Sequence, residues 1–205
     1  MEIKMGQYYK AVILGTIAKN EIESFVCGRD YNNGIKLMEH SWIGNDVVAR
    51  IEAEILNKPK RIVWAGDYAD ADMNEYDELF HKDSDGDGIN LYCLCKDELK
   101  LSKLACKRIA KYRYLVNHDK KEFVDLYYSK LPISDTYTTE KGKVIKYVVH
   151  PLPLLTCEGN GRGGGDYRSS NGEKYIGAWA RDLISLETEI INPEDLTEIK
   201  PNFKE

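Results

Sequence analysis

The chain has 205 residues, 42% hydrophobic and 31% charged, with a net charge of −5 and a pI near 5.5. This is the composition of an ordinary globular domain, and the negative charge argues against broad binding of a nucleic-acid backbone. No apolar run approaches membrane-spanning length and the N-terminus lacks the apolar core of a signal peptide, so we expect a cytoplasmic protein without membrane contact.

The first half of the chain predicts mainly strands and two helices. Strands are expected at Tyr8–Leu14, Ile22–Val26, Arg61–Ala65 and Asn90–Leu94. Asn45 or Asp46 can cap a helix with apolar positions Val47, Val48, Ile51 and Ile55, and Leu99–Ile109 reads as a second amphipathic helix.

The second half predicts a hairpin and two further strands. The hairpin joins Tyr112–Asn117 to Glu122–Tyr127, and the strands are Lys143–Val149 and Tyr175–Leu186. Because strands outnumber helices and do not alternate with them, we expect an α+β fold with a largely antiparallel sheet and two main helices. Residues 1–191 are expected to form a single domain, followed by a polar tail over residues 192–205.

A glycine-rich loop after Thr156 is the most informative feature. Glycine is costly to order, so such a loop is typical of places where the backbone turns sharply or approaches a ligand. Gly159, Gly161 and Gly164 fit G-x-G-x-x-G, but the run Asp166–Gly172 favours a turn where a dinucleotide fold needs a helix. We therefore expect a loop whose backbone N–H groups bind an anion or a carbonyl-rich ligand. The alternative is a long turn that only lets two strands cross. The candidate ligand-binding residues of the loop are Gly159, Asn160, Gly161, Arg162, Gly163, Gly164, Asp166 and Tyr167.

Two other motifs are expected to contribute to this site. Trp64–Asp70 begins at the end of a strand and offers Trp64 as a stacking face, with Asp67 and Tyr68 as polar groups; the alternative places Trp64 in the core. Leu37–Asp46 places His40 and Trp42 just before a helix; the alternative is a hydrogen-bonded structural histidine and a tryptophan in the core. We expect at least two of the three motifs to line one concave site.

No metal and no cofactor are expected. Asp83–Gly88 matches the first positions of an EF-hand loop, but Leu94 stands where a bidentate glutamate is required. The five cysteines have no paired spacing typical of zinc sites, so we expect reduced thiols.

Several motifs together resemble a family of bacterial and phage proteins. They are GQYYKAV, LMEHSW, WAGDYAD, YLVNHDKKEFVDL, HPLPLLT, EGNGRGGGDY and WARD, and they span most of the chain. The resemblance implies a small cytosolic or phage-borne protein and implies no activity.

We therefore expect a non-enzymatic protein that binds a small anionic, nucleotide-derived ligand. Association with phage makes counter-defence plausible, because sequestering a signalling nucleotide needs tight binding without turnover. One alternative is a hydrolase or transferase acting on a nucleotide, with Glu158, His40 or His150 as acid or base. A second is an inhibitor that binds a host defence protein, although a net charge of −5 is small for a nucleic-acid mimic.

Overall fold

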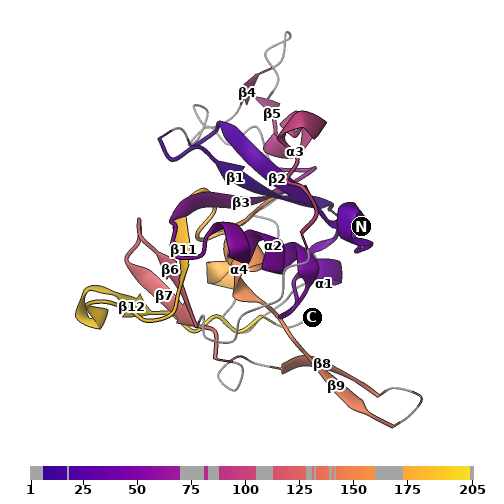
Figure 1. Cartoon of the computed structure of the whole chain (residues 1–205), viewed down its shortest axis with the longest axis vertical. Helices are drawn as coiled ribbons and strands as arrows, with labels where there is room; N and C mark the ends of the chain where they lie inside the picture. Colours follow the sequence, from indigo (N-terminus) through magenta and orange to yellow (C-terminus); the bar gives the residue numbers. More distant parts are fainter. Residues whose placement is uncertain are drawn as a thin grey trace.

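A computed structural model describes residues 7–17, 19–69, 81–82, 88–104, 113–127, 131, 133–138, 140, 142–159 and 173–203. Its centre is a mostly antiparallel sheet whose strands follow the order β12-β7-β6-β11-β3-β1-β2, with β10 beside β3 (Figure 1). These strands are β1 (Tyr9–Leu14), β2 (Ile22–Cys27), β3 (Lys60–Gly66), β6 (Tyr114–Asn117), β7 (Glu122–Asp125), β10 (Cys157–Glu158), β11 (Leu183–Glu187) and β12 (Thr197–Glu198). The predicted α+β class and largely antiparallel sheet are confirmed.

Two separate hairpins extend from this body. One is formed by β4 (His81–Lys82) and β5 (Gly88–Ile89), the other by β8 (Ile133–Thr138) and β9 (Val144–Val148). Figure 1 shows the β8–β9 hairpin projecting from the side of the molecule opposite to β4 and β5.

Four α-helices lie in the described part of the chain. They are α1 (Leu37–His40), α2 (Asp46–Glu54), α3 (Leu91–Leu94) and α4 (Pro151–Leu155). Asn45 caps α2 as predicted, since its side chain accepts a hydrogen bond from the Val47 N–H at 2.9 Å. The sequence predicted two main helices. Among the four described helices, however, only α2 is seven residues or longer.

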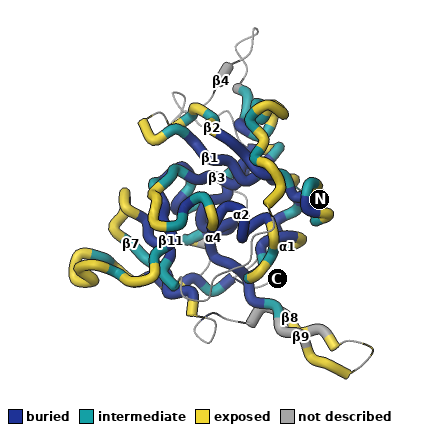
Figure 2. The backbone as a smooth tube through the Cα atoms, in the orientation of Figure 1, coloured by how far each residue is buried: buried dark blue, intermediate teal, exposed yellow. Residues whose placement is uncertain are grey.

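The sheet has a large core on one face and a smaller one on the other. Alternate residues of β1 divide between them: Ala11 and Ile13 join the large core, Val12 and Leu14 the small one. Helices α1, α2 and α4 contribute buried side chains to the large core, whereas Leu91 of α3 packs in the small core. Figure 2 shows β1, β3, α2 and α4 buried at the centre of the molecule.

Three predicted elements differ from the structure. Asn90–Leu94 forms the cap and turn of α3 and not a strand, because the Asn90 side chain accepts from the Cys93 N–H. Cys93 therefore lies on a helix, and Cys95 follows it. In the described part of the predicted helix Leu99–Ile109, Leu99 ends a 3-10 helix, Lys100 forms an isolated bridge with Phe25 of β2, and residues 101–104 belong to no helix. Of the strand predicted over Tyr175–Leu186, the first part is a run of turns and only β11 is extended.

The stretch after residue 191 is joined to the domain. A short 3-10 helix, Pro193–Asp195, leads into β12, which pairs in parallel with β7. Ile199 and Phe203 then bury their side chains in the large core. Among the described residues, no helix is long and apolar enough to cross a membrane.

Candidate functional site

The predicted site lies where β3 and β10 end side by side. The two strands are parallel, with Cys157 opposite Trp64 and Glu158 opposite Ala65. Parallel neighbours point their carboxyl ends to the same edge of the sheet, the place where open sheets commonly bind ligands. Here β3 continues into Asp67 and Tyr68, and β10 into the glycine-rich loop.

The antiparallel strand β1 brings its beginning to the same edge. Tyr9 pairs with Gly66, and beyond that pair the Asp67 N–H donates to the Tyr8 carbonyl at 3.0 Å. We call this place the β3–β10 edge and define it by the residues Gln7, Tyr8, Gly66, Asp67, Tyr68, Glu158 and Gly159.

Two glycines allow the backbones to meet here. A Cβ atom on Gly66 would lie 2.8 Å from the Glu158 carbonyl oxygen and 3.1 Å from the ring of Tyr9. A Cβ atom on Gly159 would collide with the Gln7 side chain and lie 3.0 Å from the Tyr9 hydroxyl. The glycine-rich loop therefore begins at Gly159 in close contact with β1 and β3. A larger residue at either glycine would prevent this contact.

Asp67 is held by the backbone while the neighbouring tyrosines stay accessible. Its Oδ1 accepts the Tyr8 N–H at 2.9 Å, and its carbonyl accepts the Asn90 side-chain N–H at 2.9 Å. Tyr8 is 41% exposed and Tyr68 45% exposed. The edge thus combines a fixed carboxylate with two accessible tyrosine side chains.

Glu158 is tied to an arginine that the sequence analysis did not assign. Arg181 donates from Nε to Oε2 at 2.9 Å and from Nη2 to Oε1 at 3.0 Å, and from Nη1 to the Lys19 carbonyl at 3.1 Å. Arg181 is buried and has a φ of 65°, in the left-handed region. Both Glu158 oxygens accept hydrogen bonds from Arg181, so this bidentate pair fixes the carboxylate at the start of the loop. The WARD motif contains Arg181, yet nothing in the sequence placed it beside Glu158.

His40 and Trp64 contact each other inside the core. The Trp64 Nε1–H donates to His40 Nε2 at 3.0 Å, and His40 Nδ1 lies 3.1 Å from the Gly34 carbonyl oxygen. An indole N–H can only donate, so Nε2 is the acceptor and Nδ1 carries the proton. Burial lowers the pKa of His40 to about 4, which keeps the ring neutral. Both side chains are at most 1% exposed, so in this structure they pack inside the core and do not reach the surface of the β3–β10 edge.

Trp42 lies apart from these contacts. Its Nε1–H donates to the Met38 carbonyl at 2.7 Å, and its ring is 5.1 Å from the Tyr147 ring at the base of the β8–β9 hairpin. Of the predicted ligand-binding residues in the described structure, Asp67, Tyr68 and Gly159 share the β3–β10 edge, whereas His40, Trp64 and Trp42 do not reach its surface.

His150, a candidate acid or base, is also structural. It is fully buried, its Nδ1 accepts the Leu152 N–H at 3.1 Å, and its Nε2 lies 3.0 Å from Glu52 Oε1. The first contact caps α4 and the second joins α4 to α2. Both ring nitrogens are therefore engaged in holding helices together.

The rest of the loop lies outside the described residues. The predicted ligand-binding residues in that part are Asn160, Gly161, Arg162, Gly163, Gly164, Asp166 and Tyr167. Within the described ranges, no group of three or more histidine, cysteine or acidic side chains is placed to hold a metal ion. Four cysteines in those ranges are free, and burial raises the pKa of the Cys95 thiol to about 12.

Comparison with known proteins identifies no relative: no family model, curated protein or solved structure matches this chain.

Proposed function

We propose that the protein binds a small anionic, nucleotide-derived ligand at the β3–β10 edge and does not turn it over. The observation that carries the proposal is the parallel pairing of β3 with β10, because it brings the start of the glycine-rich loop, at Gly159, and the Asp67–Tyr68 turn to one edge. Loops that follow adjacent parallel strands converge on a shared crevice, and exposed backbone N–H groups of a glycine-rich loop suit an anion.

Each part of such a ligand has a matching group at this edge. The glycine-rich loop and Arg162 would hold the phosphate, since arginine and backbone N–H groups bind phosphate oxygens well. Tyr8 and Tyr68, both exposed, would stack against the base. The Asp67 carboxylate, fixed by the Tyr8 N–H, would accept a ribose hydroxyl. In this proposal tyrosines take the stacking role that the sequence assigned to Trp64 and Trp42.

Binding without turnover is favoured by the state of the acid and base candidates. His40 and His150 are buried with both ring nitrogens engaged, and both Glu158 oxygens accept from Arg181. A general acid or base must reach the proton that it transfers, and these three side chains are directed elsewhere. A ligand held but not consumed suits a protein that sequesters a signalling nucleotide, including a phage protein acting against a host defence in the host cytoplasm.

Native mass spectrometry of the purified protein tests the proposal. We expect a retained small molecule, or an adduct after incubation with ATP, GTP, cyclic AMP, NAD or pyrophosphate. Chromatography of the same incubations should recover the added compound unchanged. Appearance of products would support the hydrolase or transferase alternative. No adduct, together with capture of a specific protein from host lysate, would support the protein-inhibitor alternative.

A further inference from the structure

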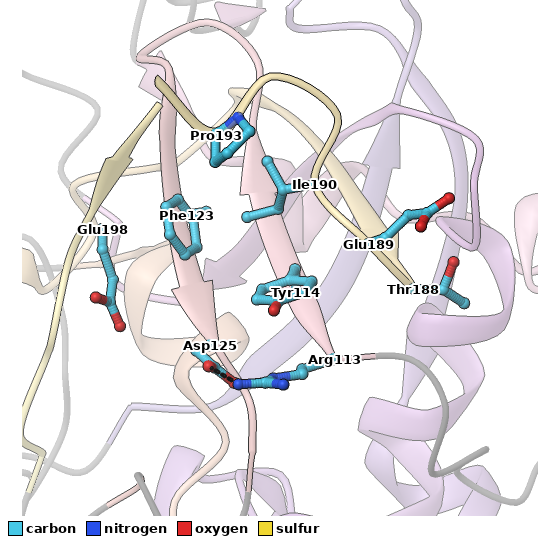
Figure 3. Close-up of a pocket in the computed structure, with 9 residues that line it drawn as sticks. All are labelled: Arg113, Tyr114, Phe123, Asp125, Thr188, Glu189, Ile190, Pro193 and Glu198. Carbon is cyan, nitrogen blue, oxygen red and sulfur yellow. Dashed lines mark hydrogen bonds and ion pairs between the residues drawn. The ribbon is translucent and has the colours of Figure 1, made fainter. Parts of the chain in front are cut away.

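A second surface hollow lies beside the β6–β7 hairpin, away from the β3–β10 edge. In the sheet order, β6 and β11 separate β7 from β3. The hollow measures about 420 Å³, and it is closed on one side by the segment that leads from β11 to β12. Figure 3 shows side chains of β6 and β7 facing those of this segment. The lining includes Arg113, Tyr114, Phe123, Asp125, Glu189 and Glu198.

Aromatic rings form the floor of the hollow. Tyr114 and Phe123 pack edge to face with ring centroids 5.9 Å apart. Tyr114 lies directly opposite Asp125, two residues beyond Phe123 on the same strand, so all three side chains are on one face of the hairpin.

Arg113, the one cationic side chain among the described residues of this lining, is already paired with a carboxylate. Arg113 binds Asp125 with both ends of its guanidinium, from Nε at 2.8 Å and from Nη2 at 2.6 Å. The same guanidinium lies 5.1 Å from the Tyr114 ring centroid and 5.3 Å from that of Tyr127. A carboxylate flanked by aromatic rings thus already binds one arginine of the chain at the border of the hollow.

Two further carboxylates remain on the rim. Glu189 has no ion-pair partner in the portion of the chain that the structure describes. Glu198 meets Lys200 at 3.2 Å, but the Lys200 side chain is 77% exposed, and such surface pairs are weak. Figure 3 shows Glu189 and Glu198 on opposite sides of the aromatic floor. The hollow therefore keeps a negative rim over an apolar base.

We propose that this hollow binds an arginine side chain from a basic segment of a partner protein. A planar guanidinium stacks on aromatic rings and pairs with carboxylates, and Arg113 makes both contacts next to the site. The neighbouring surface argues for a protein rather than a small cation. Tyr127 is 57% exposed and Ile191, next to the lining residue Ile190, is 79% exposed. A free cation would leave both apolar side chains in water, whereas a protein segment would cover them.

Backbone NMR with short peptides tests this inference. The probe is acetyl-Leu-Arg-Leu amide, compared with the same peptide carrying citrulline, which has the shape of arginine without its charge. We expect the arginine peptide to shift the amide signals of Tyr114, Phe123 and Thr188, and the citrulline peptide to leave them in place.

Variants locate the binding. The double variant Glu189→Gln/Glu198→Gln should lower the affinity for the arginine peptide about tenfold, which is the combined effect of losing two exposed ion pairs of ordinary strength. The control Glu98→Gln/Glu140→Gln removes the same charge from exposed positions on η3 (Asp97–Leu99) and the β8–β9 turn and should bind like the unaltered protein. The inference is overturned if both peptides shift the same signals equally, if the rim variant binds unchanged, or if no peptide binds. Equal binding of arginine methyl ester and the peptide would also overturn it, in favour of a small-cation site.

Discussion

His40 illustrates what residue identity leaves open. A histidine next to a predicted helix start is compatible with catalysis or ligand contact, and sequence spacing does not report burial. The structure shows that both ring nitrogens have partners in the core. Trp64 donates a hydrogen bond to Nε2, and the Gly34 carbonyl oxygen accepts one from Nδ1–H. By contrast, the glycine-rich sequence already indicates the close approach of the backbone that the structure shows at Gly159, and the part of Gly159 in ligand binding stays a prediction.

The neutral state of His40 makes stability depend on pH. Its pKa is about 4 in the folded protein against 6.5 in the unfolded chain, so between these values the unfolded state binds more protons. Stability from this residue is complete above pH 6.5 and falls by about 3 kcal/mol as the pH drops to 4. The free energy of unfolding, measured by urea denaturation at several pH values in this range, should fall less steeply with decreasing pH for His40→Gln than for the unaltered protein. An equal dependence on pH in the two proteins would contradict a neutral buried His40.

At the scale of elements, segments bounded by clear turn or capping residues were predictable, whereas short helices were not. The β6–β7 hairpin and the Asn45 cap of α2 follow from alternation, turn residues and capping chemistry. Helices α3 and α4 have four and five residues, too few for a helical period to appear in the sequence. Helix α4 also begins with proline at its first position, where the missing N–H costs nothing, and His150 supplies the cap.

The pair of His150 with Glu52 should therefore stabilise the junction of α2 and α4. Replacing His150 by alanine removes the cap of α4 and leaves a buried glutamate without this partner, so we expect a loss of about 3 kcal/mol or more in the free energy of unfolding. In a double-mutant cycle with Glu52→Gln, the combined loss should be smaller than the sum of the two single losses. Additive losses would show that the contact contributes no coupling.

At the scale of the whole molecule, the candidate site depends on a pairing that no local pattern reveals. Glu158 and Ala65 are distant in sequence, yet they lie opposite each other on β10 and β3. Arg181 then joins the two ends of the segment that contains the glycine-rich loop, through its bidentate contact with Glu158. The motifs in the sequence indicated which residues to consider, and the order of the strands determines that Tyr8, Asp67, Tyr68 and Gly159 can act together while Trp42 cannot.

Calorimetric titration of a charge-reversal variant tests the anion-binding claim most directly. The titrants are ATP, GTP, cyclic AMP, NAD and pyrophosphate, and the proteins are the unaltered chain, Arg162→Glu and the exposed control Lys58→Glu, which lies between α2 and β3. We predict that at least one titrant binds and that Arg162→Glu lowers the affinity for this titrant at least about tenfold, because the cation proposed to bind the phosphate is replaced by an anion. The free energy of unfolding of Arg162→Glu should change by less than about 0.5 kcal/mol, as the sequence predicts for a residue of a polar loop, and Lys58→Glu should bind normally. Equal affinity for the unaltered chain and Arg162→Glu, or no binding of any titrant to the unaltered chain, would contradict the proposed site.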